Sequence, residues 1–180
     1  MKVLCYGDSN TYGYDPRSYF GDRYSKSHRW VDILESLSDW TIVNDGLNGR
    51  EIPNYKVQLD SEYDMVIVML GTNDLLKGRT LFEIEERMTS FLQELLSQTG
   101  DVVLIAPPKL QLGEWVPNLE LVAISERLGE VYLRISNTLG IRYIDSTLWG
   151  IELSYDGVHF SEKGHITFAN RLYSFLMGGK

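Results

Sequence analysis

Two runs of consecutive apolar residues constrain the fold of this chain more than any other feature of its sequence. They are DMVIVML, residues 64–70, and DVVLIAPP, residues 101–108. Short apolar runs that are rich in β-branched residues are typical of strands buried on both faces. Such strands occur in parallel sheets that helices cover on both sides. We therefore expect a parallel sheet at the centre of the fold.

Strand and helix patterns alternate along the rest of the chain. This alternation predicts an α/β fold of three layers, in which a doubly wound parallel sheet of about five strands carries helices on both faces. At 180 residues the chain has the length of one domain, residues 1–180. Besides the two apolar runs, we expect strands at residues 3–5, 41–45 and 141–145, and helices within residues 27–40, 80–100, 121–139 and 161–176.

Polar residues and glycines mark the ends of these helices. Thr80, followed three residues later by Glu83, predicts a capping box at the start of the second helix. Gly100 and Gly140 are expected to end the second and third helices. Ser161 is expected to cap the last helix.

The acidic composition argues against several classes of partner. The formal net charge is −8 and the pI is near 4.9, whereas nucleic-acid binders usually carry a basic face, so we expect no nucleic-acid partner. Cys5 is the single cysteine, so an internal disulfide is excluded and the thiol is expected to pack as a small apolar group. No apolar segment reaches the length of a transmembrane helix, and the N-terminus lacks a signal-peptide pattern. The expected location is the cytoplasm.

Four polar motifs follow strands or precede the last helix. They are GDSN at 7–10, NDGLNGR at 44–50, GTND at 71–74 and DGVH at 156–159. In a doubly wound sheet these loops can gather over one crevice at the carboxyl ends of the strands. They would bring together a serine, a glycine-rich turn, an asparagine, and an aspartate with a histidine.

These residue types suit acyl transfer. Ser9 is a candidate nucleophile, and His159 has the intrinsic pKa of a base that accepts the hydroxyl proton. Asp156 lies three residues before His159 and can orient the imidazole, as in a Ser-His-Asp triad. An oxyanion hole needs donors, which the backbone N–H groups of Ser9 and Gly49 and the side-chain amide of Asn73 could supply.

Purely structural roles are open for the same residues. Ser9 could be the N-cap of a following helix, and Asn73 with Asp74 could cap the turn after the third strand. Gly49 could serve turn geometry alone. We expect His28 and His165 to be structural rather than catalytic.

Taken together, the four motifs resemble the signature blocks of the SGNH hydrolases, also called GDSL lipases and esterases, in order and in spacing from residue 7 to residue 159. The resemblance implies a flavodoxin-like five-stranded sheet, with Ser9 as nucleophile, Gly49 and Asn73 as oxyanion donors, His159 as base and Asp156 as its partner. CYGDSNTYG, GLNGR and VIVMLGTNDL are most similar to the arylesterase and acyltransferase branch, whose members hydrolyse or transfer short acyl groups. Asn10 stands where the name-giving motif has leucine. The implied substrate is a small ester, and the implied reaction needs no metal and no cofactor.

The same residues are compatible with two other functions. Asp8, Asp74, Asp156 and His159 could instead be the ligands of a metal-assisted phosphohydrolase, because carboxylates and imidazole bind divalent metals. A binding module that has lost catalysis is the second alternative, although an intact serine, histidine and asparagine argue against it.

Two loops are longer than their connections require, at residues 14–27 and 107–118. Long loops in compact domains often serve as lids or pocket walls. Tyr12 and Trp115 are the candidates for the substrate-pocket wall. The tyrosine-rich segment 14–27 could also serve an interface in a homo-oligomer.

Overall fold

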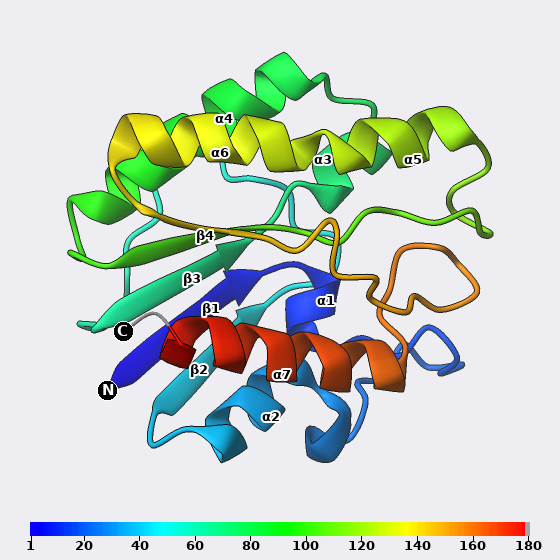
Figure 1. Cartoon of the computed structure of the whole chain (residues 1–180), viewed down its shortest axis with the longest axis horizontal. Helices are drawn as coiled ribbons and strands as arrows, with labels where there is room; N and C mark the ends of the chain where they lie inside the picture. Colours follow the sequence, from blue (N-terminus) through cyan, green and yellow to red (C-terminus); the bar gives the residue numbers. More distant parts are fainter. Residues whose placement is uncertain (179–180) are drawn as a thin grey trace.

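The computed structural model describes residues 1–178. It shows a five-stranded parallel sheet with helices on both faces (Figure 1). The strands are β1 (Lys2–Gly7), β2 (Thr41–Gly46), β3 (Met65–Met69), β4 (Val102–Ala106) and β5 (Arg142–Asp145). Their order in the sheet is β2-β1-β3-β4-β5, and every neighbouring pair is parallel. The predicted doubly wound α/β fold is confirmed.

Alternate residues of the central strands enter two separate cores. In β3, Val66 and Val68 pack with α4 (Leu81–Leu96) and α6 (Leu128–Leu139) on one face. Met65, Ile67 and Met69 pack on the other face with α2 (Trp30–Leu37) and α7 (Glu162–Gly178). Figure 1 shows the two helix pairs on opposite sides of the sheet. This two-sided burial explains why the sequence of β3 is apolar without interruption.

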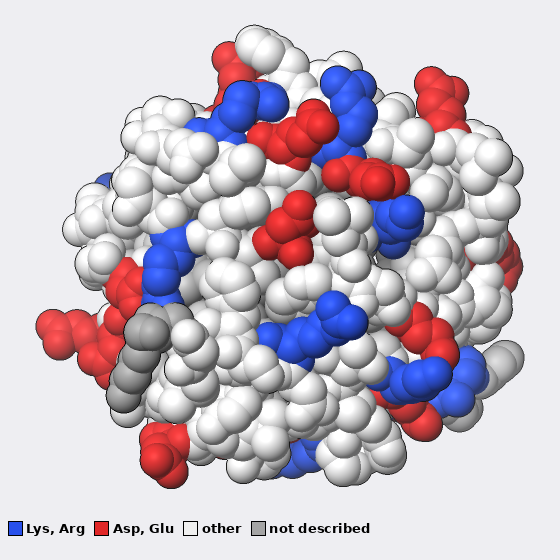
Figure 2. Space-filling model, in the orientation of Figure 1, with Lys and Arg blue, Asp and Glu red and all other residues white. Residues whose placement is uncertain are grey.

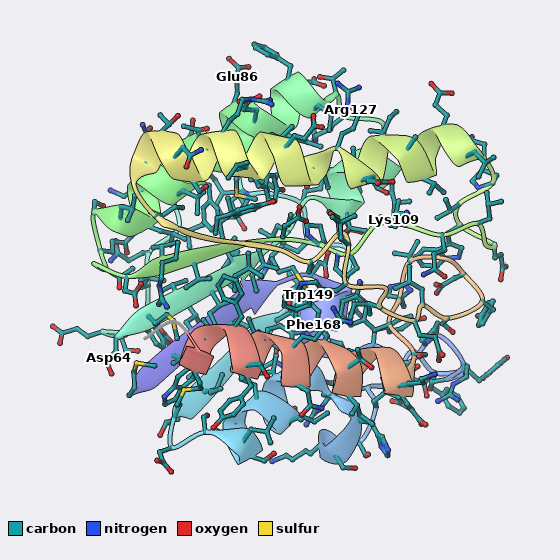
Figure 3. All side chains as sticks on the ribbon, viewed as in Figure 1. Asp64, Glu86, Lys109, Arg127, Trp149 and Phe168 are labelled. Carbon is teal, nitrogen blue, oxygen red and sulfur yellow. The ribbon has the colours of Figure 1, made fainter. Side chains whose placement is uncertain are left out.

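Aromatic contacts fix α7 against its face of the sheet. The ring of Phe168 lies 5.4 Å from that of Trp149 and 5.2 Å from those of Trp30 and Phe160. Trp149 and Phe168 are labelled between the sheet and α7 in Figure 3. Because only two residues separate the DGVH motif from α7, these contacts also restrain the loop that precedes the helix.

The helix ends differ from the predictions in two places. The capping box of Thr80 and Glu83 is confirmed, but α4 ends at Leu96 with Ser97 as its C-cap rather than at Gly100. The helix α4 ends early because the next N–H groups bond to carbonyls three residues back rather than four. Ser97 N–H donates to the Glu94 carbonyl, and Gln98 N–H donates to the Leu95 carbonyl.

The predicted helix at 121–139 is two helices, α5 (Leu119–Glu126) and α6. They are separated at Arg127, whose N–H bonds to Ile124 and Ser125 instead of to the carbonyl four residues back. Gly140 ends α6 as predicted, with a left-handed φ of +66°. Ser161 caps α7 through its Oγ, which accepts the Gly164 N–H at 3.0 Å.

Charged residues of both signs are interspersed on the face shown in Figure 2. Within residues 1–178, no helix has the length and apolar content needed to cross a membrane.

Candidate active site

The serine of the GDSN motif begins a one-turn helix at the carboxyl end of β1. Asp8 is the N-cap of α1 (Ser9–Tyr12), and its carboxylate accepts the Asn10 N–H at 2.9 Å. The interpretation of Ser9 as an N-cap is therefore wrong, because Asp8 does that work. Position 7, just before Asp8, requires glycine, because a Cβ there would collide with the Thr11 side chain.

Ser9, His159 and Asp156 form one chain of hydrogen bonds. The Oγ of Ser9 lies 3.0 Å from His159 Nε2, and His159 Nδ1 lies 2.6 Å from Asp156 Oδ2. The carboxylate facing Nδ1 favours a proton on that nitrogen, which leaves Nε2 free to accept the serine hydroxyl proton. The three residues are only 5%, 3% and 1% exposed, so water is largely excluded from these bonds.

The loop at 156–159 folds tightly around its own carboxylate. Asp156 Oδ1 accepts the N–H groups of Val158 and His159, both at 2.9 Å. Burial raises the pKa of Asp156, but the hydrogen bonds from the His159 ring and from these two amides outweigh it, and the pKa lies below its ordinary value. Gly157, with φ at +79°, makes the turn that places the carboxylate against its own chain.

Two of the predicted oxyanion donors, Gly49 and Asn73, are linked through Arg50. Asn73 lies in α3 (Thr72–Leu76), directly after β3, and its Nδ2 donates to the Arg50 carbonyl at 3.1 Å. Gly49 precedes Arg50 in an exposed turn with φ at +73°. The Arg50 guanidinium in turn donates to the Gly7 carbonyl at 3.0 Å and pairs with Asp45 at 2.7 Å. Arg50 therefore ties the GLNGR loop to the end of β1, a role that the sequence motifs did not reveal.

Two aromatic rings lie against the imidazole of His159. The ring of Trp115 is 5.2 Å away, and that of Tyr14 is 4.7 Å away. Trp115 is 51% exposed and so presents a free surface beside His159. The predicted Tyr12 instead lies beneath the Arg23 guanidinium, at 4.3 Å. Because Gly13 turns the chain with φ at +87°, Tyr14 and not Tyr12 reaches the imidazole.

The four residues considered as metal ligands are engaged in other contacts. Asp74 accepts the Ile52 N–H at 3.0 Å and lies 3.4 Å from Arg87 and 3.6 Å from Arg79. Both oxygens of Asp156 are hydrogen-bonded within its own loop. In the part of the chain that the structure describes, no group of three or more His, Cys, Asp or Glu residues has a metal-binding arrangement. The phosphohydrolase alternative has no support here.

Burial shifts the pKa of three further groups. The Asp8 carboxyl has its pKa raised to about 6 by desolvation, which the Asn10 N–H and His159 partly offset. Desolvation lowers the pKa of His165 to about 3, and this residue is buried in α7 with Tyr24 and Phe160. It also raises the pKa of the Cys5 thiol, which is fully buried in β1. His165 is therefore a neutral packing residue, as expected.

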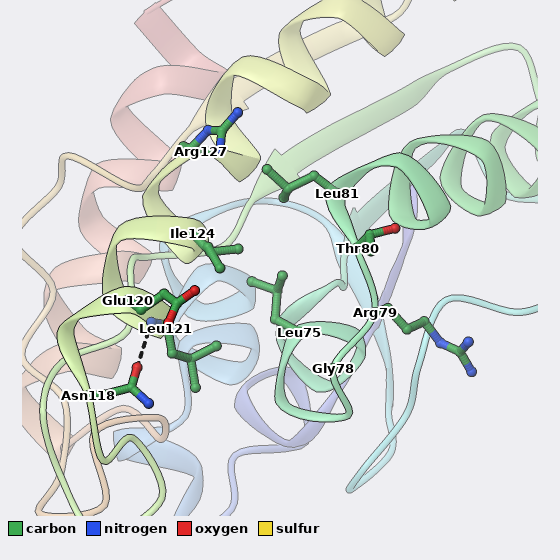
Figure 4. A pocket seen from close by; sticks show the side chains of 10 residues that line it. All are labelled: Leu75, Gly78, Arg79, Thr80, Leu81, Asn118, Glu120, Leu121, Ile124 and Arg127. Carbon is green, nitrogen blue, oxygen red and sulfur yellow. Dashed lines mark hydrogen bonds between the residues drawn. The ribbon is translucent and has the colours of Figure 1, made fainter.

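A separate groove of about 540 Å³ lies between the start of α4 and the helix α5 (Figure 4). Its floor is apolar, with Leu75, Leu81, Leu121 and Ile124, and its rim includes Arg79 and Arg127. Ser9, Asp156 and His159 do not line this groove.

The model of the GDSL-like Lipase/Acylhydrolase family matches residues 5–165. The chain belongs to this family. Its members are hydrolases of carboxylic esters, so this GDSL family member is a carboxylic ester hydrolase. No curated protein matched it by sequence.

Solved structures of similar fold cover almost the whole family member. An aryl esterase of M. smegmatis is 23% identical, with 98% of each chain covered and a TM-score of 0.80. A carbohydrate acetylesterase from Sinorhizobium meliloti is 24% identical, with 98% of each chain covered and a TM-score of 0.79. A lipolytic protein of the G-D-S-L family from Veillonella parvula DSM 2008 is 19% identical, with 98% of this chain and 97% of the other covered and a TM-score of 0.74. At these identities the likeness is one of fold.

Proposed function

We propose that this protein is a serine esterase whose single domain, residues 1–180, hydrolyses small esters of short acyl groups. The observation that carries the proposal is the chain of contacts from Ser9 Oγ to His159 Nε2, at 3.0 Å, and from His159 Nδ1 to Asp156 Oδ2, at 2.6 Å. A hydroxyl, an imidazole and a carboxylate in this order are the parts of a nucleophile activated by an oriented base.

In the first half of the reaction, Ser9 Oγ attacks the ester carbonyl while its proton passes to His159 Nε2. Asp156 stabilises the imidazolium through the Nδ1 proton. The oxyanion accepts hydrogen bonds from the Ser9 and Gly49 N–H groups and from the Asn73 amide. When the carbon–oxygen bond to the alcohol breaks, the proton on Nε2 goes to the departing oxygen, and the acyl group stays on Ser9.

Water completes the second half. His159 Nε2 removes a proton from a water molecule as its oxygen attacks the acyl carbonyl. When the new tetrahedral intermediate collapses, the bond between the acyl carbon and Ser9 Oγ breaks, the acid leaves, and His159 Nε2 returns its proton to Ser9 Oγ. A second alcohol in place of water would give acyl transfer by the same steps.

The acyl group and the alcohol are expected to be small. Trp115 and Tyr14 border the imidazole, and flat rings at this position favour an aryl or a sugar alcohol stacked against them. The aryl esterase and carbohydrate acetylesterase of similar fold act on esters of these two kinds by their names. The sequence has no long insertion that would build a deep acyl tunnel.

The decisive experiment is a panel of p-nitrophenyl esters, from acetate to palmitate, run beside acetylated sugars. We expect the highest kcat/KM for the shortest acyl chains, loss of turnover in Ser9→Ala and His159→Ala, and covalent labelling of Ser9 by a fluorophosphonate. Activity that EDTA abolishes and a divalent metal restores would instead favour a metal-dependent hydrolase. If no ester is cleaved and Ser9 is not labelled, the proposal is wrong.

A further inference from the structure

We propose that Asn10 is a positioning residue, which holds the histidine loop in register with the nucleophile through a two-pronged hydrogen bond on either side of His159. This inference rests on the proposed function, because it gives Asn10, the last residue of the GDSN motif, a part in positioning the triad. Asn10 follows Ser9 directly and is 4% exposed.

The side-chain amide of Asn10 bonds to both residues that flank His159. Its Nδ2 donates to the Val158 carbonyl at 3.1 Å, and its Oδ1 accepts the Phe160 N–H at 2.8 Å. The nucleophile and the base are 150 residues apart in sequence, and Asn10 joins the backbone next to one with the backbone around the other. A displacement of this loop relative to α1 would move Nε2 away from Ser9 Oγ.

The amide itself is fixed by the rest of the residue. The Asn10 N–H donates to Asp8 Oδ1 at 2.9 Å, and the Asn10 carbonyl accepts the indole N–H of Trp30 at 2.9 Å. Trp30 is fully buried at the start of α2, where its backbone N–H donates to His165 Nδ1 at 3.4 Å. The backbone of Asn10 is therefore held by Asp8 and by the buried Trp30, and this fixes the position from which its side-chain amide extends.

Few other side chains could make both bonds. Two partners of opposite kind, a carbonyl and an N–H, must be met at once, and an asparagine presents one donor and one acceptor side by side. Leucine, found at this position in the name-giving motif, has neither. A serine has a single oxygen, which cannot reach both. Replacement of Asn10 by leucine would leave the buried Val158 carbonyl and Phe160 N–H without partners, and replacement by serine would leave at least one of them without a partner.

A merely structural bond and a positioning bond give different kinetic results. The matched control is Thr99→Ala, because Thr99 Oγ1 makes a buried hydrogen bond to the Tyr63 carbonyl at 3.2 Å, beside the amino end of β3. If Asn10 only adds stability, its replacement should lower Tm as Thr99→Ala does and leave kcat unchanged. If Asn10 positions the base, kcat falls while KM hardly changes, since the residue does not contact substrate.

The experiment compares Asn10→Leu, Asn10→Ser and Thr99→Ala with the wild type, using p-nitrophenyl acetate kinetics, Tm, and the downfield proton NMR signal of His159 Nδ1–H. We expect kcat to fall about 10- to 100-fold in both Asn10 variants, the range for a misplacement of about 1 Å. KM should stay within about twofold, and the Nδ1–H signal should shift or broaden. Thr99→Ala should keep both its kcat and its NMR signal.

Each outcome decides the proposal. A kcat within about twofold of wild type in a folded Asn10 variant overturns it, as does an unchanged Nδ1–H signal. Should Asn10→Leu not fold, Asn10→Ser is judged by the same criteria. Failure of the proposed function is distinguishable, because wild-type protein would then neither cleave esters nor be labelled at Ser9 by a fluorophosphonate.

Discussion

Replacement of Asp8 by asparagine is expected to raise the stability of the protein at neutral pH. Asp8 is 1% exposed, and desolvation raises the pKa of its carboxyl to about 6 despite the bond from the Asn10 N–H. Asparagine has nearly the same shape, retains an oxygen for that N–H and caps helices equally well. It differs in carrying no charge that must be buried.

The size and pH dependence of the gain follow from the pKa of Asp8. In the unfolded chain this carboxyl titrates at its ordinary 3.8, so between about pH 4 and 6 the folded protein retains a proton that the unfolded chain has lost. Wild-type stability therefore falls through this window as pH rises, and the loss is complete about one pH unit above the folded pKa, near pH 7. A difference of about two pKa units corresponds to about 3 kcal/mol. For a protein of this size that is about 6 to 12 °C in Tm.

Thermal unfolding of the wild type and Asp8→Asn, followed by circular dichroism at half-unit steps from pH 5 to 8, tests this reasoning. The Tm of the variant should exceed that of the wild type by an amount that grows from pH 5 to about 7 and is then constant. A variant that is no more stable at pH 8, or a difference that is the same at every pH, would refute the argument.

Three further predictions concern the oxyanion hole, the triad carboxylate and a helix cap. Asn73→Ala should lower kcat about 10²–10³-fold on p-nitrophenyl acetate, and a loss below tenfold would mean that its amide serves only the Arg50 carbonyl. Asp156→Asn should lower kcat by up to about 10⁴-fold, because an amide N–H facing His159 Nδ1 favours the wrong tautomer; a small loss in steady-state assays would mean that another acceptor orients the ring. Thr80→Ala should lower Tm by about 2–4 °C at unchanged kcat, since it removes the cap of α4 far from the triad; an unchanged Tm would contradict this.

The sequence was sufficient to predict the sheet because the central strands are buried on both faces. The alternate residues of β3 enter two different cores, and an uninterrupted apolar run is the direct result. Local spacing could not reveal the break at Arg127, because the apolar positions continue in phase from Leu121 to Leu139. The break depends on the Arg127 N–H, which bonds to the carbonyls two and three residues back rather than to the one four residues back.

The candidate site was predictable where its chemistry lies within a short motif. Asp156 and His159 are three residues apart, and the turn at Gly157 is encoded locally. Tyr14 and Arg50 were missed because their contacts join loops that are distant in the chain. The position of the Tyr14 ring follows from the left-handed turn at Gly13, and both tyrosines flank that glycine equally in the sequence.

Several polar contacts join different loops at the candidate site. Arg50 ties the GLNGR loop to Gly7, the last residue of β1, and Asn10 ties α1 to both sides of His159. The Tyr155 hydroxyl donates to the Pro16 carbonyl at 2.8 Å, which joins the 14–27 loop to the segment before the histidine. On the proposed function, the loss of one of these bonds would displace a reacting group, whereas a change of volume within an apolar core would leave the bonds in place. Substitutions at these tying residues should therefore reduce kcat more than their effect on Tm would indicate.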